Sequence, residues 1–241
     1  MKKLYVILLA SLSMMLFSCG DDEPNDYRIN RDPVDLGLSV KWAPMNVGAA
    51  APQAMGGLYG WADSTGRHDP IESENPVAIS FRMFDGREIT TVDWRSPYFG
   101  GKNPLENISG TDYDIARYMW SPDWRIPTAD EWQELIDLCT WTPVADIEGA
   151  TGTVFRVTGP NGNSIIIPLG GINTANVNEA RGLEGHYWTS MLLPLLEQAD
   201  YNYQSEVPCA AWSVKILRNG KISSEPQVRC FRLSVRPVLA Q

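Results

Sequence analysis

Residues 124–132 constrain the fold more than any other part of the sequence. Thr128 and Glu131 have the S/T-x-x-E spacing of a capping box, in which each side chain satisfies a backbone donor at a helix start. Pro127, directly before this cap, keeps the preceding residue extended. The pattern therefore predicts a helix over about residues 129–139. Its core-facing residues are predicted to be Trp132, Leu135, Ile136 and Cys139.

The remaining chain predicts short strands. Residues 39–43 alternate apolar and polar side chains with period two, which is typical of a half-buried strand. Asp114 has the chemistry to cap a second, shorter helix over residues 115–120. Turn residues separate several other extended runs. The further strands are predicted over residues 57–61, 153–158, 164–169, 185–190 and 233–238. Together they indicate the α+β class, with mostly short antiparallel strands, one or two helices and long loops.

Two segments, residues 63–111 and 191–208, are predicted to be long loops. Both are rich in polar and turn-forming residues, and long ordered loops often carry function. The aromatic residues in them are candidate ligand contacts, because exposed rings stack on sugars or anchor protein interfaces. The alternative is that these rings attach their own loops to the domain. The four candidates are Trp94, Tyr98, Tyr201 and Tyr203.

The N-terminus has the pattern of an export signal. Lys2 and Lys3 precede an apolar run over residues 4–17, which is too short to span a bilayer comfortably. Residues 16–20, Leu-Phe-Ser-Cys-Gly, resemble the bacterial lipobox. We therefore predict that residues 1–18 are removed and that Cys19 carries the lipid. The alternative is a plain secretory peptide with an incidental cysteine.

Residues 19–32 are predicted to form an acidic tether. Residues 20–24, Gly-Asp-Asp-Glu-Pro, contain no apolar side chain to bury. This run resembles the acidic export tag of Bacteroidetes surface lipoproteins. That resemblance implies a lipid-anchored protein on the outer face of the outer membrane. The other interpretation is a solvated linker that holds the domain away from the periplasmic leaflet.

Composition indicates one folded domain over residues 33–241. Apolar residues make up 44% of the chain, and nine tryptophans are too many for a disordered stalk. The formal net charge is −9, and removal of the two lysines in residues 1–18 leaves it more negative still. Nucleic acid and anionic lipid surfaces are therefore poor partners for the domain.

Cys209 and Cys230 are candidates for a disulfide. Asn219 and Gly220 form a strong hairpin signal, and in the simplest two-residue turn the two cysteines face each other. The sequence at residues 223–226 interrupts the second strand and could shift this register. The cross-strand disulfide is therefore one of two alternatives.

Six segments, in this order, resemble the Fibrobacter succinogenes major paralogous domain family, which is abundant in Bacteroidetes surface lipoproteins. The resemblance extends over Val34 to Val238 and covers nearly the whole predicted domain. Its motifs are specific for the family and do not indicate an activity. The matching segments are residues 34–43, 46–49, 124–128, 157–165, 185–190 and 234–238.

This family is distantly similar to formylglycine-generating enzymes and to C-type lectin-like domains. The shared signature is an Asp-x-Ala helix start, here Asp114 and Ala116, followed by the Arg125–Trp132 helix start. The resemblance implies a compact C-type lectin-like fold whose chain ends meet in one sheet below a loop-rich face. It also implies structural roles for Trp42, Asp114, Trp124, Arg125, Pro127, Thr128, Glu131, Trp132, Trp188 and Arg236.

These observations favour a non-catalytic binding module for a glycan or a surface protein. The close-spaced cysteine pair of formylglycine-generating enzymes is absent, and no catalytic residues stand out. A structural or adhesin subunit of an envelope assembly is the alternative, and a glycan-acting enzyme is the third. No cofactor or metal site is predicted. Four aspartates have oxygen ligands suited to calcium, although a helix cap explains Asp114 equally well. They are Asp112, Asp114, Asp123 and Asp130.

Overall fold

The computed structural model describes most of the predicted domain. It covers residues 30–63, 77–82, 88–93, 105–174, 177–201, 203–204 and 208–241. The predicted signal peptide, Cys19, Trp94 and Tyr98 lie outside these residues.

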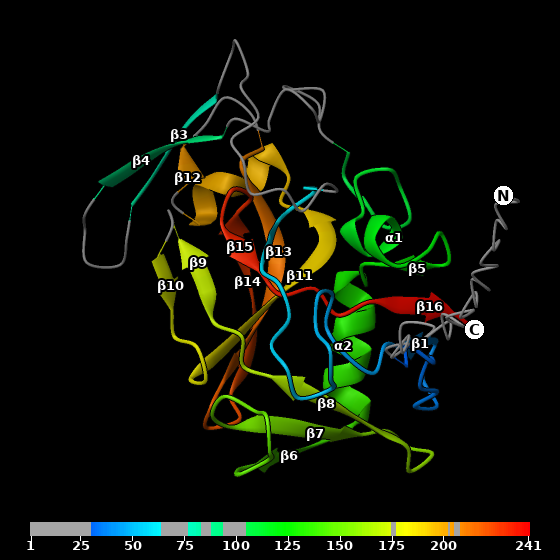
Figure 1. Cartoon of the computed structure of the whole chain (residues 1–241). Helices are drawn as coiled ribbons and strands as arrows, with labels where there is room; N and C mark the ends of the chain where they lie inside the picture. Colours follow the sequence, from blue (N-terminus) through cyan, green and yellow to red (C-terminus); the bar gives the residue numbers. More distant parts are fainter. Residues whose placement is uncertain are drawn as a thin grey trace, which may run out of the picture.

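Small antiparallel sheets are the main regular structure of the described chain (Figure 1). One sheet has the order β1 (Val40–Trp42), β16 (Val238–Ala240) and β5 (Trp124–Arg125). A second has the order β10 (Val177–Glu179), β9 (Ile172–Thr174), β15 (Arg232–Leu233) and β2 (Tyr59–Gly60). A third contains β11 (Glu184–Leu192), β13 (Ala210–Leu217) and β14 (Ile222–Val228). The others are β12 (Tyr203–Gln204) with β3 (Val77–Arg82) and β4 (Glu88–Asp93), and β6 (Thr140–Val144) with β7 (Val154–Thr158) and β8 (Ser164–Pro168).

Two short α-helices begin at the predicted caps. Helix α2 (Ala129–Leu138) starts at the capping box of Thr128 and Glu131, and both reciprocal hydrogen bonds are present. Helix α1 (Ile115–Met119) starts at Asp114, whose side chain accepts from the first-turn amides. A 3₁₀ helix, η2 (Leu195–Tyr201), follows β11. The α+β class and both helix starts are therefore confirmed.

The apolar side chains gather into two neighbouring clusters. One cluster surrounds Trp61 and Trp188, and the other surrounds Trp42 and Trp132. The rings of Trp42 and Trp132 meet edge to face with centroids 5.0 Å apart. A hydrogen bond joins the two clusters, because the indole nitrogen of Trp132 in one donates to the backbone carbonyl of Trp188 in the other. Each such fully buried large side chain contributes roughly 1.5–3 kcal/mol to stability.

The two ends of the described chain meet in one sheet. Strand β16, near the C-terminus, lies between β1 and β5 (Figure 1). Its pairing with β1 runs from Val40 opposite Ala240 to Trp42 opposite Val238. The N-terminal part of the domain is thus held by the last residues of the chain.

The hairpin between β13 and β14 differs by one residue from the predicted register. The amide of Leu217 donates to the carbonyl of Lys221, which closes a three-residue loop. Gly220 occupies the left-handed position of this loop with φ of 85°. A two-residue turn was the wrong assumption, so the facing pairs shift by one.

Cys209 and Cys230 therefore do not face each other, and of the two alternatives the shifted register is the one present. The carbonyl of Cys209 accepts from the amide of Arg229 at 2.9 Å, so Arg229 occupies the facing position. Both cysteines, like Cys139, are thiols in the structure.

Two predicted loops contain regular structure. Strands β3 and β4 form a hairpin inside residues 63–111, and β12 from the second loop pairs with β3. Tyr203 faces Phe81 in this pairing. Because β12 is far from β3 in sequence, local composition did not reveal their pairing.

Candidate functional site

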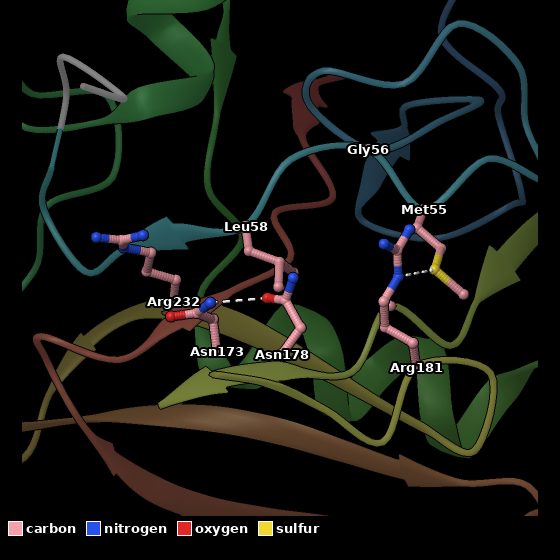
Figure 2. Close-up of a pocket in the computed structure, with 8 residues that line it drawn as sticks. Met55, Gly56, Leu58, Asn173, Asn178, Arg181 and Arg232 are labelled. Carbon is pink, nitrogen blue, oxygen red and sulfur yellow. Dashed lines mark hydrogen bonds between the residues drawn. The ribbon is translucent and has the colours of Figure 1, made fainter. Parts of the chain in front are cut away.

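A pocket of about 270 Å³ opens beside the sheet that contains β9, β10 and β15 (Figure 2). Its walls come from the loop before β2, from the segment between β8 and β11, and from β15. Its lining residues are Met55, Gly56, Leu58, Gly170, Asn173, Asn178, Arg181 and Arg232.

Two asparagines face each other across the paired strands β9 and β10. Asn173 is opposite Asn178 in the register, and its Nδ2 donates to Oδ1 of Asn178 at 2.7 Å (Figure 2). Asn173 is buried, whereas Asn178 is exposed. An amide offers two donors and an acceptor with two lone pairs. The pair therefore retains donors and acceptors for a ligand after bonding to itself.

Arg181 stands at one end of the pocket. Its Nε donates to the sulfur of Met55 at 3.2 Å, and a thioether is a weak acceptor that leaves the charge in place. The preceding residue, Ala180, has φ of 56°, a conformation that is costly for a residue with a β-carbon. Strain of this kind gathers at functional sites, where the surrounding structure maintains it.

Arg232 stands on the other side of the asparagine pair from Arg181 (Figure 2). Its strand, β15, pairs with Asn173 of β9 and with Gly60 of β2. The sheet therefore fixes the position of the Arg232 backbone. Two guanidinium groups thus flank a central pair of amides.

The loop that forms the upper wall is positioned by backbone contacts. Gly56 has φ of 73°, and an added β-carbon there would lie 2.5 Å from the carbonyl oxygen of Val47. Only glycine suits this position without displacement of the backbone. Nδ2 of Asn46 donates to the carbonyl of Met55 at 2.9 Å, which holds the adjacent residue.

A buried arginine holds this loop from behind. Arg236 is fully buried, and its Nε donates to Oδ1 of Asn46 at 2.9 Å. Its other nitrogens donate to the carbonyls of Ala43 and Ile166 at 2.9 and 2.6 Å. Burial lowers the pKa of Arg236 to about 10, so the guanidinium remains charged at neutral pH. Through Asn46, it supports the wall of the pocket at Met55.

Gly170 forms the part of the pocket wall called the floor here, and it lies directly against Ser234. A β-carbon added there would lie 2.6 Å from Oγ of Ser234. That hydroxyl is fully buried, and no group among the described residues forms a hydrogen bond with it. Buried polar atoms are usually satisfied, so Ser234 provides an unused polar group directly behind the floor.

Of the four predicted aromatic contacts, the structure describes the side chain of Tyr201 alone. Tyr201 is partly exposed and meets the ring of Trp212 edge to face, with centroids 5.5 Å apart. It does not line the pocket. Tyr203 is described by its backbone in β12, and Trp94 and Tyr98 lie outside the described residues.

The motif residues are part of the internal scaffold. Arg125 and Glu131 form an ion pair in which Nη2 lies 2.5 Å from Oε1. Burial alone would raise the pKa of Glu131, but hydrogen bonds from Arg125 and Thr128 bring it below its ordinary value. Pro127 and all four of the predicted structural tryptophans are buried. These tryptophans are Trp42, Trp124, Trp132 and Trp188.

Both oxygens of Asp114 are occupied by backbone amides. One accepts from Gly110 and Ile126 at 2.8 Å each, and the other from Ala116 at 2.9 Å. Burial raises the pKa of Asp114 despite these hydrogen bonds. Within the described residues, no group of three or more His, Cys, Asp and Glu side chains is arranged to hold a metal.

His186 is buried in β11 and hydrogen-bonds to Glu184, which also forms an ion pair with Lys215. Its Nε2 lies 2.9 Å from Oε2 of Glu184, and the amine of Lys215 lies 3.1 Å from the same oxygen. Burial lowers the pKa of His186. Burial acts to raise the pKa of Glu184. Hydrogen bonds from His186 and Lys215 outweigh this effect, and the pKa lies below its ordinary value.

A broader hollow of about 700 Å³ lies where the described chain begins. Asn30 and residues 32–35 and 50–52 contribute to its walls, which are mostly apolar. It contains no lysine, arginine or histidine among its lining residues. The first pocket, which Asn173, Asn178, Arg181 and Arg232 line, is therefore the better site for recognition of polar groups. We call it the Asn173–Arg181 pocket.

Comparison with known proteins adds no identification. No family model, curated protein or solved structure matches this chain. Among the described residues, no helix has the length and apolar character needed to cross a membrane.

The sequence interpretation missed the polar residues of the pocket. They come from three separated segments, and Arg232 lies in a two-residue strand without a recognisable pattern. One local signal was present: asparagines at positions 173, 176 and 178 follow directly on the Gly170-Gly171 pair. Such a run between two strands indicates exposed amide groups near a tight backbone turn.

Proposed function

We propose that the protein is a non-catalytic binding module that holds a glycan in the Asn173–Arg181 pocket. The observation that carries this proposal is the asparagine pair at the centre of the pocket, with donors and acceptors still available beside an arginine. A sugar hydroxyl both donates and accepts, so amides complement it. Both asparagines lie on paired strands and hydrogen-bond to each other, which reduces the ordering cost of binding.

The lining chemistry favours binding over hydrolysis. Glycoside hydrolysis generally requires two carboxyl groups on either side of the scissile bond. The described lining residues contribute amides, guanidinium groups, backbone and apolar side chains. A glycan held here would therefore be recognised without a general acid and base pair among those residues.

The proposal extends to the place where the protein acts. Lys2, Lys3 and the apolar run before Cys19 support a lipoprotein signal, and the acidic residues that follow support export to the cell surface. We place the protein on the outer membrane through a lipid on Cys19. The paired chain ends and the two helix starts support membership of the Fibrobacter major paralogous family with a C-type lectin-like fold.

A structural or adhesin subunit is the second candidate, and η2 favours it. Leu196 is 94% exposed, and Leu195 and Tyr201 on the same short helix are each more than one-third exposed. Apolar groups displayed in this way are typical of protein contacts. This surface would serve assembly of an envelope complex.

A glycan array with a soluble form of the chain, residues 20–241, which lacks the predicted signal peptide and the predicted lipidated cysteine, tests the glycan proposal. We expect specific binding that Asn178→Ala weakens about tenfold or more, because each lost hydrogen bond contributes about 1 kcal/mol and the remaining amide is also left without its partner. Asn178 is exposed, so the variant should fold normally.

Gln133→Ala is the matched control, since Gln133 is an exposed amide on α2. A Trp94→Ala, Tyr203→Ala double variant tests the loop aromatics in parallel. An array without signals, measured with and without calcium, would contradict glycan binding. Concentration-dependent self-association that Leu196→Ser abolishes would then favour the assembly role.

A further inference from the structure

The charged side chains among the described lining residues of the Asn173–Arg181 pocket are of one sign. Arg181 and Arg232 line it, and no aspartate or glutamate is among its described lining residues. The chain as a whole has a formal net charge of −9. The pocket thus has the opposite charge to the protein as a whole, and this local positive charge attracts anions to the pocket.

Arg181 is available for a ligand. It is exposed, and Nε contacts the Met55 sulfur, which fixes the side chain along the loop without neutralising it. Within the part of the chain that the structure describes, no carboxylate forms an ion pair with Arg181. A guanidinium with free N–H donors binds planar or tetrahedral oxyanions through paired hydrogen bonds.

The asparagines distinguish this site from a simple anion site. Asn173 and Asn178 lie between the two arginines (Figure 2), so an anionic group on Arg181 would place the rest of its molecule over the amides. Inorganic phosphate or sulfate would leave those amides unused. A sugar with an acidic substituent would engage both parts of the pocket.

We propose that the ligand of this pocket is an acidic glycan, in which a carboxylate or sulfate binds Arg181 and neighbouring hydroxyls bind Asn173 and Asn178. This inference rests on the proposed glycan-binding function and specifies its substrate class. Arg232 contributes a second positive charge at the far side of the amides.

The test uses an array that contains uronate-bearing and sulfated glycans together with their methyl-esterified and desulfated counterparts. The same soluble form of the chain should bind acidic members and show little binding to the matched neutral ones. Titration calorimetry with the best acidic glycan should show that Arg181→Gln lowers affinity about 10- to 100-fold, as expected for loss of a charge-assisted hydrogen bond. Arg181→Lys should retain part of the affinity because the charge remains.

Arg156→Gln is the matched control, because Arg156 is an exposed arginine on β7, in the sheet formed with β6 and β8. Affinity should also fall as salt is raised from about 0.1 to about 1 M, where the screening length shortens from about 10 to about 3 Å. The uronate and sulfate arms identify which anion is bound, and either supports the proposal.

Two results would overturn it in distinguishable ways. Equal binding of acidic and neutral counterparts, with Arg181→Gln unchanged, would leave glycan recognition standing and reject the acidic class. Absence of any glycan binding would reject the function and the substrate class together.

Discussion

His186 illustrates how one buried side chain links stability to pH. Its Nε2 is hydrogen-bonded to Glu184, whereas Nδ1 is buried and has no hydrogen-bond partner among the residues that the structure describes. Protonation would add a second N–H donor that finds no acceptor there. Lys215 adds a nearby positive charge, and Glu184 and Glu225 add negative ones, but burial dominates and lowers the pKa of His186.

We expect the free energy of unfolding to decrease as pH is lowered from about 7 to 5. The folded pKa of His186 lies below the unfolded value, so the unfolded chain binds more protons in this window. This residue contributes at most about 1.4 kcal/mol per pH unit. Urea unfolding followed by tryptophan fluorescence should show a shallower pH dependence in His186→Gln.

His68, the other histidine in the chain, is retained in both proteins and serves as an internal control. Identical slopes for the two proteins would show that His186 has no part in the effect. The lowered pKa of Glu184 adds a loss of the same sign at more acidic pH, below its ordinary titration range.

At the scale of elements, local sequence chemistry predicted where helices begin. Thr128, Glu131 and Asp114 act within a few residues of themselves, so a capping pattern identifies its own structure. The hairpin register was less predictable, because a two-residue and a three-residue turn both suit Asn219 and Gly220. The choice between them depends on how the strands pack, which local sequence does not contain.

Asp114 connects α1 to β5 and provides a test at this scale. Asp114→Ala should lower the free energy of unfolding by about 2–4 kcal/mol, because the buried amides of Ala116 and Ile126, and the exposed amide of Gly110, lose their acceptor. Chemical denaturation provides the measurement. Asp123→Ala, an exposed aspartate in the loop between these elements, should change stability by less than about 0.5 kcal/mol. Similar losses in both variants would contradict the capping role.

At the scale of the whole molecule, the pocket could not be predicted from the sequence. The α+β class followed from local patterns, and the aromatic-rich loops drew attention as candidate sites. Met55, Asn173 and Arg232, however, come together through the pairing of very short strands. Such strands are stabilised by tertiary contacts, so their partners are not encoded in their own composition.

Arg236 unites distant parts of the chain and should therefore affect global stability. Arg236→Met is expected to lower the free energy of unfolding by about 3 kcal/mol or more, since Asn46, Ala43 and Ile166 each lose a buried donor. Arg236→Lys should recover less than half, because an ammonium lacks the planar fork that reaches all three acceptors.

Arg156→Met is the control for Arg236, since Arg156 is exposed and its loss should be nearly neutral. Both stability changes can be measured by urea unfolding. A loss below about 1 kcal/mol in Arg236→Met would show that the surrounding carbonyls find other donors.

The pairing of β1 with β16 brings residue 40 opposite residue 240. When the first and last strands of a domain lie side by side, the segments joined to them need to be only a short distance apart. Such a domain can be inserted into a surface loop of a host protein without forcing the two sides of that loop apart. The fold is therefore suited to modular reuse, at the end of a tether or within a larger polypeptide, with the same pocket presented in each setting.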